Sequence, residues 1–170
     1  YTPYFSHPDP TVDRQSGFLA PSIFSSSTIG YGVKVPYYYV IDEDKDMTIT
    51  PTITSKEGVQ MAAEYRQAVE SGSFQFDGSL TYVDKVDRNN NETGGQEFQG
   101  HIRGDGQFRL DETWVWGYDI FRTTHDTYLK KYDISDADTL TSTAYLQGQR
   151  GRNLSLLSAY SFQGLTAADV

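Results

Sequence analysis

The clearest structural signal in this chain is MTITPTIT, residues Met47–Thr54, in which apolar and hydroxyl side chains alternate at almost every step. A two-residue period places the apolar side chains on one face of a β-strand and the hydroxyls on the other. The same period governs residues 29–40 before this segment and residues 59–66 after it. We therefore expect an all-β protein whose sheet has one apolar face and one polar face.

Similar alternation along the rest of the chain predicts an antiparallel meander of about nine strands. The other alternating segments are residues 17–23, 74–82, 98–103, 114–120, 140–149 and 154–162. Residues 59–66 also contain good helix formers, but we expect a strand there because both neighbours are strands of similar length. The polar stretches Asp84–Gly95 and Thr123–Asp138 are expected to be loops.

Composition excludes several classes of protein. The hydrophobic content of 37% is low for a compact soluble core, yet aromatic residues reach 14%, which argues against disorder. A net charge of −9 argues against a nucleic-acid surface. The chain has no cysteine, and its three histidines lack ligand spacing, so we expect no disulfide, metal or cofactor. It opens with Tyr1 rather than with Met and a basic region, so we expect an excised segment.

A transmembrane β-barrel accounts for this combination of features. Strands of roughly 8–12 residues match the about 9–11 residues that a tilted strand needs to cross a bilayer, and no apolar run is long enough for a transmembrane helix. An odd number of strands leaves an open edge, so the chain is expected to be the front part of a larger barrel. A soluble β-sandwich or lipocalin-like module that binds a lipid or glycan shares the alternation and stays open. A secreted glycan-active enzyme is a third hypothesis, although no pattern here places two carboxylates across a cleft.

Two prolines fall within alternating segments of the first two predicted strands. Pro21 lies in GFLAPSI, residues 17–23, and Pro36 lies in IGYGVKVPYYYV, residues 29–40. Proline has no N–H to donate to a ladder, so a central strand normally excludes it. Two neighbouring strands with one proline each predict a seam with missing hydrogen bonds, which is either an edge or a place that opens.

Several motifs resemble the LptD family, the lipopolysaccharide-assembly outer-membrane proteins also called organic solvent tolerance proteins. They occur in the family's order and approximate spacing over nearly the whole chain. The matching stretches are Tyr4-Phe5, Arg14–Pro21, Val35–Tyr38, Asp46–Pro51, Lys56–Gly58, Glu64–Arg66 and, more loosely, Asp126–Asp133. The chain departs from the family at Tyr39-Val40-Ile41, where the family usually has Trp-Asn-Ile.

The resemblance implies a transport protein rather than an enzyme, located in the outer membrane of a Gram-negative bacterium. Lipopolysaccharide would arrive from the periplasmic LptA bridge through a jelly roll absent from this chain and would enter the outer leaflet through a lateral gate. Residues 1–13 would be the end of the jelly roll and a connector with Pro8 and Pro10 as its hinge, and residues 14–170 would be the front of the barrel. We expect Pro21 and Pro36 to form the gate.

The aromatic residues of two strands are the remaining candidates for functional contacts. They are Tyr37, Tyr38, Tyr39, Trp114 and Trp116. Amphipathic rings are favoured where membrane meets water, so we expect them at the interface with outer-membrane lipids. The resemblance implies an alternative, in which they pack in the lumen against the lipoprotein plug LptE.

Overall fold

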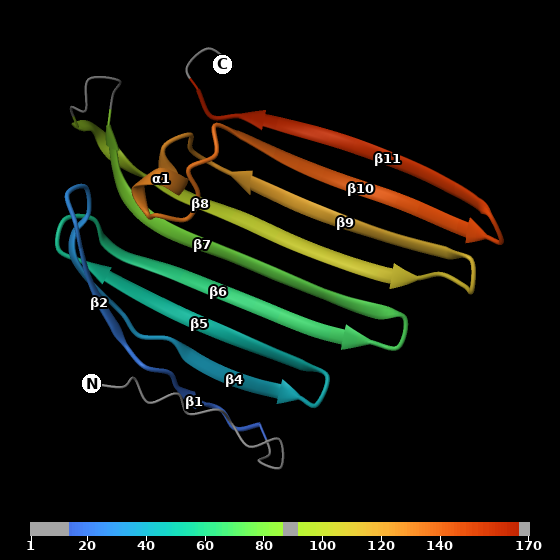
Figure 1. Ribbon diagram of the computed structural model, residues 1–170. Helices are drawn as coiled ribbons and strands as arrows, with labels where there is room; N and C mark the ends of the chain where they lie inside the picture. Colours follow the sequence, from blue (N-terminus) through green and yellow to red (C-terminus); the bar gives the residue numbers. More distant parts are fainter. Residues whose placement is uncertain (1–13, 87–91, 167–170) are drawn as a thin grey trace, which may run out of the picture.

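The computed structural model describes residues 14–86 and 92–166 and shows an all-β fold (Figure 1). Within these residues there are eleven strands and one helix of four residues. The strands are β1 (Gly17–Phe18), β2 (Ser22–Ser26), β3 (Gly30–Lys34), β4 (Tyr37–Asp42), β5 (Lys45–Thr54), β6 (Gly58–Val69), β7 (Gly72–Val86), β8 (Glu92–Arg109), β9 (Trp114–Thr123), β10 (Thr139–Arg150) and β11 (Asn153–Gly164). The helix α1 (Tyr128–Lys131) lies between β9 and β10.

The strands form one antiparallel sheet in chain order, as the alternation predicts. From β5 to β11 each strand pairs with the next. At the amino-terminal edge, β1 pairs with β4, β2 pairs with β3, and both β3 and β4 pair with β5. The pair β1 and β2 therefore acts as one interrupted strand, and β3 and β4 act as a second. Counted in this way, the described residues make nine strands, which confirms the expected meander.

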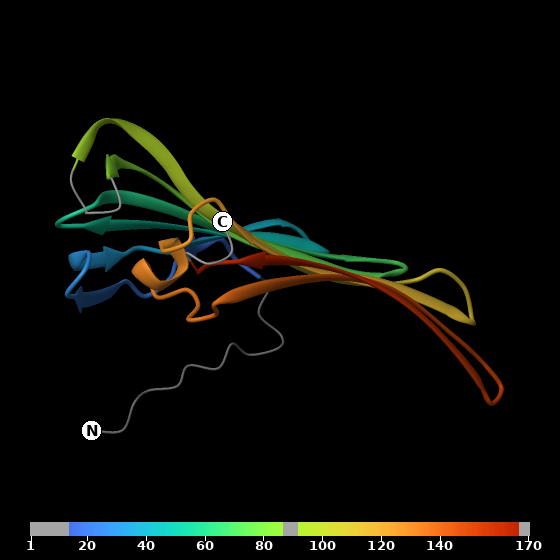
Figure 2. The same ribbon diagram turned by 90° about the horizontal axis from the view of Figure 1, so that it is seen from above.

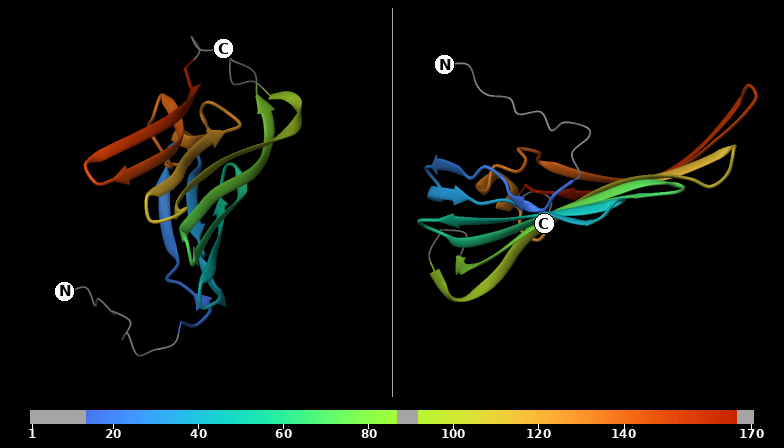
Figure 3. Two further views of the ribbon diagram at one scale, coloured as in Figure 1. Left: turned by 90° about the vertical axis from the view of Figure 1, so that its right-hand side faces the viewer. Right: turned by 90° about the horizontal axis from the view of Figure 1, so that it is seen from below.

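The sheet is a single twisted layer that does not close on itself. Seen from above, it is thin, with α1 beside it at the end where the β2–β3 and β5–β6 turns lie (Figure 2). The β10–β11 hairpin projects beyond the other strands at the opposite end (Figure 3). Within the described range, the edges of the sheet are the β1–β2 strand and β11. An open, curved sheet of this kind is consistent with part of a barrel wall.

Exposure on the two faces is the reverse of that in a soluble domain. Cross-strand register aligns Thr52, Gln60, Thr81 and Gln99 on one face, and each is between 2% and 6% exposed. The opposite face carries exposed apolar side chains. Among them are Ile53 (58%), Met61 (45%), Leu80 (49%), Phe98 (64%) and Ile102 (50%). Water would penalise this arrangement, whereas lipid on the apolar face would stabilise it.

The connection between β9 and β10 differs from the polar loop that its sequence predicts. It forms α1, and Tyr128 and Leu129 are fully buried in a small cluster with Tyr132, Ile29 and Leu140. Lys131 adds an ion pair of 2.7 Å to Glu57 in the β5–β6 turn. We call residues 124–138 the inner loop, because Tyr128 is held by the polar face of the sheet.

Two other predictions are settled by the strand boundaries. Residues 59–66 belong to β6, so the strand interpretation is confirmed over the helix. The loop expected at Asp84–Gly95 is shorter, because β7 extends to Val86 and β8 begins at Glu92. The described residues include no helix that is long and apolar enough to cross a membrane.

Candidate functional site

The interruptions in the first two strands lie at the prolines. Pro21 separates β1 from β2, and Pro36 separates β3 from β4, so each stands between strand segments rather than inside one. The sequence placed both prolines within continuous strands, and the structure corrects this. Fixed φ and a missing N–H make proline a weak point in a ladder, and at Pro21 and Pro36 the pairing stops, whereas β5 continues through Pro51.

A third proline lies at the same level of the sheet. The pairs Lys34 with Thr52 and Tyr37 with Ile49 place Pro36 opposite Thr50, and its neighbour Val35 opposite Pro51 within β5. The pairs Ser22 with Lys34 and Phe18 with Tyr37 likewise place residues 19–21 opposite residues 35–36. Pro21, Pro36 and Pro51 therefore form a row across three adjacent strands, which we call the proline row.

Two backbone hydrogen bonds cross the proline row. Leu19 N–H donates to Pro36 C=O at 2.9 Å, and Val35 N–H donates to Pro51 C=O at 3.1 Å. The N and C=O of one strand residue point to the same side. The position of the missing Pro36 donor therefore faces the first strand. Residues 19–21 lie opposite residues 35–36, so the first strand has one extra residue at Pro21 and its regular alternation is broken there. The missing donor of Pro36 falls in the seam between these two strands.

A charged network on the polar face anchors the chain just before β1. Asp46 is 4% exposed and accepts a bond of 2.8 Å from Arg66 Nε. Arg14 also contacts the Asp46 carboxylate, and its guanidinium donates to the Tyr38 hydroxyl at 2.6 Å. Arg14 thereby ties the start of the described chain to β5 across β4. No sequence motif marks this contact, in which two guanidinium groups share one carboxylate.

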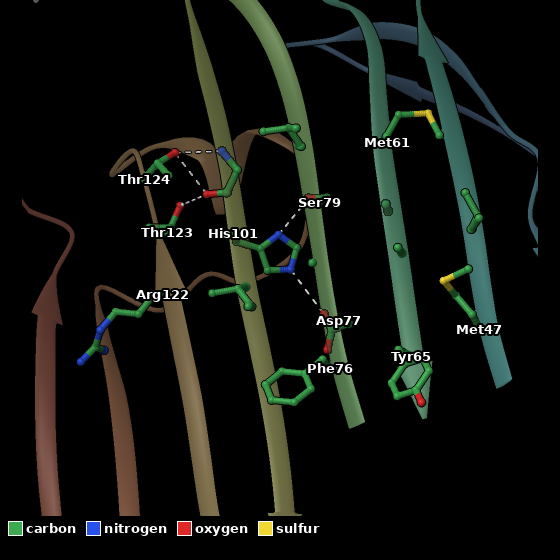
Figure 4. Close-up of a pocket in the computed structure, with 17 residues that line it drawn as sticks. Met47, Met61, Tyr65, Phe76, Asp77, Ser79, His101, Arg122, Thr123 and Thr124 are labelled. Carbon is green, nitrogen blue, oxygen red and sulfur yellow. Dashed lines mark hydrogen bonds and ion pairs between the residues drawn. The ribbon is translucent and has the colours of Figure 1, made fainter. Parts of the chain in front are cut away.

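A second network holds the inner loop against the sheet, and Figure 4 shows its members Ser79, His101 and Asp77. Ser79 Oγ lies 2.7 Å from the Tyr128 hydroxyl and 2.8 Å from His101 Nδ1. Gln60 Nε2 donates to the same Tyr128 oxygen at 2.9 Å, and His101 Nε2 lies 3.3 Å from Asp77 Oδ2. Burial raises the pKa of Tyr128 above its ordinary value, so its hydroxyl keeps the proton it can donate.

The order serine, histidine, carboxylate in this network resembles a hydrolase triad, but its surroundings favour an anchor. Ser79 is 7% exposed, and its hydroxyl lies within hydrogen-bonding distance of Gln60, Tyr128 and His101. A nucleophile needs room for a substrate carbonyl and donors aimed at the oxyanion. The tyrosine that covers Ser79 occupies that space. We interpret the network as the means by which the inner loop is fixed to β6, β7 and β8.

The candidate aromatic residues divide between the two faces. Tyr37 and Tyr39 pair with Ile49 and Met47 on the apolar face, whereas Tyr38 points to the polar face. Both tryptophans belong to the apolar face, where Trp116 stacks on Phe108 with ring centroids 4.6 Å apart. The hinge candidates Pro8 and Pro10 lie outside the described residues.

Aromatic pairs bracket the apolar face along β8. Tyr82 packs on Phe98 near the β7–β8 loop, with ring centroids 4.6 Å apart. Trp116 packs on Phe108 near the β8–β9 turn, also with ring centroids 4.6 Å apart. Phe98 and Phe108 are ten residues apart, or about 33 Å along an extended strand. A strand tilted by about 40° lowers this span to about 25 Å, the height of the apolar band of outer-membrane barrels. Among the described residues, no three His, Cys, Asp or Glu side chains lie close enough together to hold a metal ion.

Comparison with known proteins gives a consistent result. Residues 97–169 match the family model for LptD, described as LPS transport system D. The chain is 32% identical to the LPS-assembly protein LptD of Idiomarina loihiensis over 150 residues, which is 88% of this chain and 19% of that protein. It is 32% identical to that of Pseudoalteromonas atlantica over 129 residues (76% and 16%), and 29% identical to that of Pectobacterium atrosepticum over 182 residues (100% and 22%). The chain therefore spans about a fifth of the length of these relatives.

Proposed function

Since the chain belongs to the LptD family, we propose that it is the front wall of an outer-membrane barrel that transports lipopolysaccharide and inserts it into the outer leaflet. The observation that carries this proposal is the inverted pattern across β5 to β8, in which polar side chains are buried on one face and large apolar side chains are exposed on the other. The apolar face meets lipid, and the polar face lines the lumen.

The proline row is the structural basis of a lateral gate at the first strands. Pro36 lacks a donor on the side that faces the first strand, and Pro21 lies where the pairing of the first strand changes register. Each ladder bond contributes a net of about 1 kcal/mol, so the loss weakens the seam by about 1–3 kcal/mol. At about 1.4 kcal/mol per decade, this shifts an opening equilibrium by about 5- to 100-fold. The first strand can then bend away from the wall while the strands beyond β5 stay paired.

The two faces suggest how an amphipathic glycolipid is handled. Its sugar portion passes along the polar lumen face, and its lipid portion leaves sideways where the first strand meets the last strand of the complete barrel. Residues 1–13 would end the jelly roll that receives lipopolysaccharide from LptA, with Pro8 and Pro10 as the hinge. LptE would fill the lumen as a plug, and the tyrosines and tryptophans of the apolar face would contact outer-membrane lipids.

A soluble sandwich or lipocalin-like module is the alternative function. Such a domain would gather its apolar side chains in a dry interior, yet here Phe18 is 76% and Ile23 is 81% exposed. The open single layer also lacks the second sheet of a sandwich in the residues described. Both features favour the membrane wall.

The gate is tested by replacing Pro21 and Pro36 together with Ala in the full-length protein that contains this chain. Restored donors should strengthen the seam, so lipopolysaccharide display at the cell surface should fall by about 5-fold or more. A photo-crosslinking residue at Ile23, exposed on the free edge, should capture less lipopolysaccharide in the double variant.

Pro3→Ala is the matched control, because it removes a proline that lies before the described sheet and should leave surface display unchanged. Unchanged display and unchanged crosslinking in the Pro21→Ala/Pro36→Ala variant would refute the gate. Normal surface display after depletion of the full-length protein would refute the transport function itself.

A further inference from the structure

A groove crosses the apolar face of the sheet. It is open along the face, has a volume of about 690 Å³ and is lined almost entirely by apolar atoms (Figure 4). Register places one row of residues along it from strand to strand, and this row consists of Ile49, Ala63, Gly78, Ile102 and Arg122. Large side chains stand on either side of the small pair Ala63 and Gly78, namely Met61 with Leu80 and Tyr65 with Phe76. The groove exists because small residues on two adjacent strands form its floor.

The two ends of the groove lie at different distances from the short turns that precede β5 and β9. Ile49 is the fifth residue of β5, counted from Lys45, whereas Arg122 is the ninth residue of β9, counted from Trp114. Both strands begin at the end of the sheet where the short turns β4–β5, β6–β7, β8–β9 and β10–β11 lie. At about 3.3 Å per residue, the Arg122 end lies about 13 Å farther from those turns than the Ile49 end. If the apolar face lies in a bilayer, the groove descends from the long-loop side toward the middle of the hydrocarbon.

Arg122 gives this groove a charged end. Its guanidinium donates to Phe121 C=O at 2.9 Å and to the hydroxyl of Ser161, which is exposed on β11. No carboxylate lies within ion-pair distance of it among residues 14–86 and 92–166. An arginine on a lipid-facing surface is unfavourable unless it reaches the headgroups or an anion. A phosphate would supply the missing partner, since guanidinium and phosphate match in geometry and charge.

We propose that this groove binds a phosphorylated glycolipid of the outer leaflet. The phosphate contacts Arg122, the Ser161 hydroxyl is available to a sugar hydroxyl, and one acyl chain lies over Ala63 and Gly78. The volume falls within the about 300–1,000 Å³ of small-molecule sites. The site rests on the proposed function in one respect, because it requires the apolar face to lie in the membrane. It would hold a glycolipid on the outside of the barrel, away from the lumen.

The test uses the full-length protein that contains this chain, stripped of lipid in detergent and titrated with purified lipid A. Native mass spectrometry counts the lipid A molecules bound per protein. Arg122→Gln removes the charge and should lower the affinity of one bound lipid A by about 10-fold. Ala63→Phe fills the floor of the groove and should remove the same bound molecule.

The matched controls are Arg109→Gln, an exposed arginine at the end of β8 beside the β8–β9 turn, and Ile120→Phe, on the apolar face but outside the groove. Both should bind lipid A as the wild type does. Equal binding by all four variants would overturn the site, and so would a phosphatidylglycerol titration with the same affinity and the same dependence on Arg122. The readout is independent of the gate, because Pro21→Ala/Pro36→Ala should bind this lipid A normally even where export fails.

Discussion

The first two strands and the β6–β8 wall have the same alternating pattern but differ in how continuously they pair. β6 and β7 are joined by ten consecutive residue pairs, from Gln60–Thr81 to Val69–Gly72. The first strand meets the second through two pairs in one half and five in the other, with Pro21 and Pro36 between the halves. The ladder is therefore continuous in the wall and broken at the edge.

This difference shows how a sheet can combine a rigid wall with a movable edge. Local opening free energies depend on how many bonds and contacts must break together. A row of prolines at one level weakens neighbouring strands at the same place, which concentrates bending there. Arg14 limits this motion at the start of the first strand, because its contact with Asp46 ties the chain before β1 to β5. The edge is thus hinged at the proline row and fixed at its start.

A proline moved from the edge into the wall should have the largest effect. Ala62→Pro in β6 removes a ladder bond and leaves its partner carbonyl unpaired at membrane depth, which should destabilise the full-length protein by about 3 kcal/mol or more. Ala20→Pro, in the gap beside Pro21, should change stability by less than about 1 kcal/mol. Heat-dependent gel mobility of the full-length barrel measures both. Equal loss of folded protein in the two variants would remove the distinction between edge and wall.

A charge should be tolerated on one face of β7 and not on the other. Leu80→Arg places a guanidinium on the apolar face and should cost about 2–4 kcal/mol if that position is near the bilayer centre. Gln75→Arg, on the polar face of the same strand, should cost less than about 1 kcal/mol. Urea unfolding of the full-length protein in lipid bilayers gives both values. A larger loss for Gln75→Arg would mean that the two faces are assigned the wrong way round.

Release of the inner loop should have an intermediate effect. Tyr128→Phe leaves Ser79 and Gln60 without their shared partner, which should cost about 1–3 kcal/mol and make residues 124–138 more sensitive to protease. Tyr160→Phe, which removes an exposed hydroxyl from β11, serves as the control and should leave cleavage unchanged. Limited proteolysis of the full-length protein measures this cleavage. If both variants were cleaved at the wild-type rate, Tyr128 would not anchor the inner loop.

The smallest effect is expected at Arg14. Arg14→Gln removes one of two guanidinium groups from Asp46, but the Arg14 side chain is 45% exposed, so the loss should be about 0.5–1 kcal/mol. Raising the salt concentration should reduce the difference between variant and wild type, because ions screen exposed charges. Chemical denaturation at low and high salt measures this. A difference that grows with salt would show that Arg14 acts through packing rather than charge.

The sequence was sufficient for features that depend on a local period. The alternation in Met47–Thr54 predicted β5 together with its two faces, and the same rule identified β6 despite its helix-forming residues. The prolines were recognised as residues that lack a ladder donor, but they were placed inside continuous strands. Their exact place between strand segments, and the alignment of Pro51 with them, depend on register, which a single sequence does not encode locally.

Other features were missed because they depend on contacts between distant residues. Tyr128 and Leu129 stand in a polar stretch, and nothing in their spacing marks them as buried. Arg14 and Asp46 are 32 residues apart and meet only because β4 and β5 pair. Arg122 joins the groove through register across five strands. A composition-based search for a site could find the charges but not the face on which each one lies.

Hydrogen–deuterium exchange on the full-length protein in lipid nanodiscs tests the contrast between edge and wall most directly. Amides of residues 17–26 should exchange at least about 10-fold faster than those of residues 72–83, and Pro21→Ala/Pro36→Ala should reduce that difference. Equal protection of the two segments in the wild-type protein would contradict the account, because the broken ladder would then provide no movable edge.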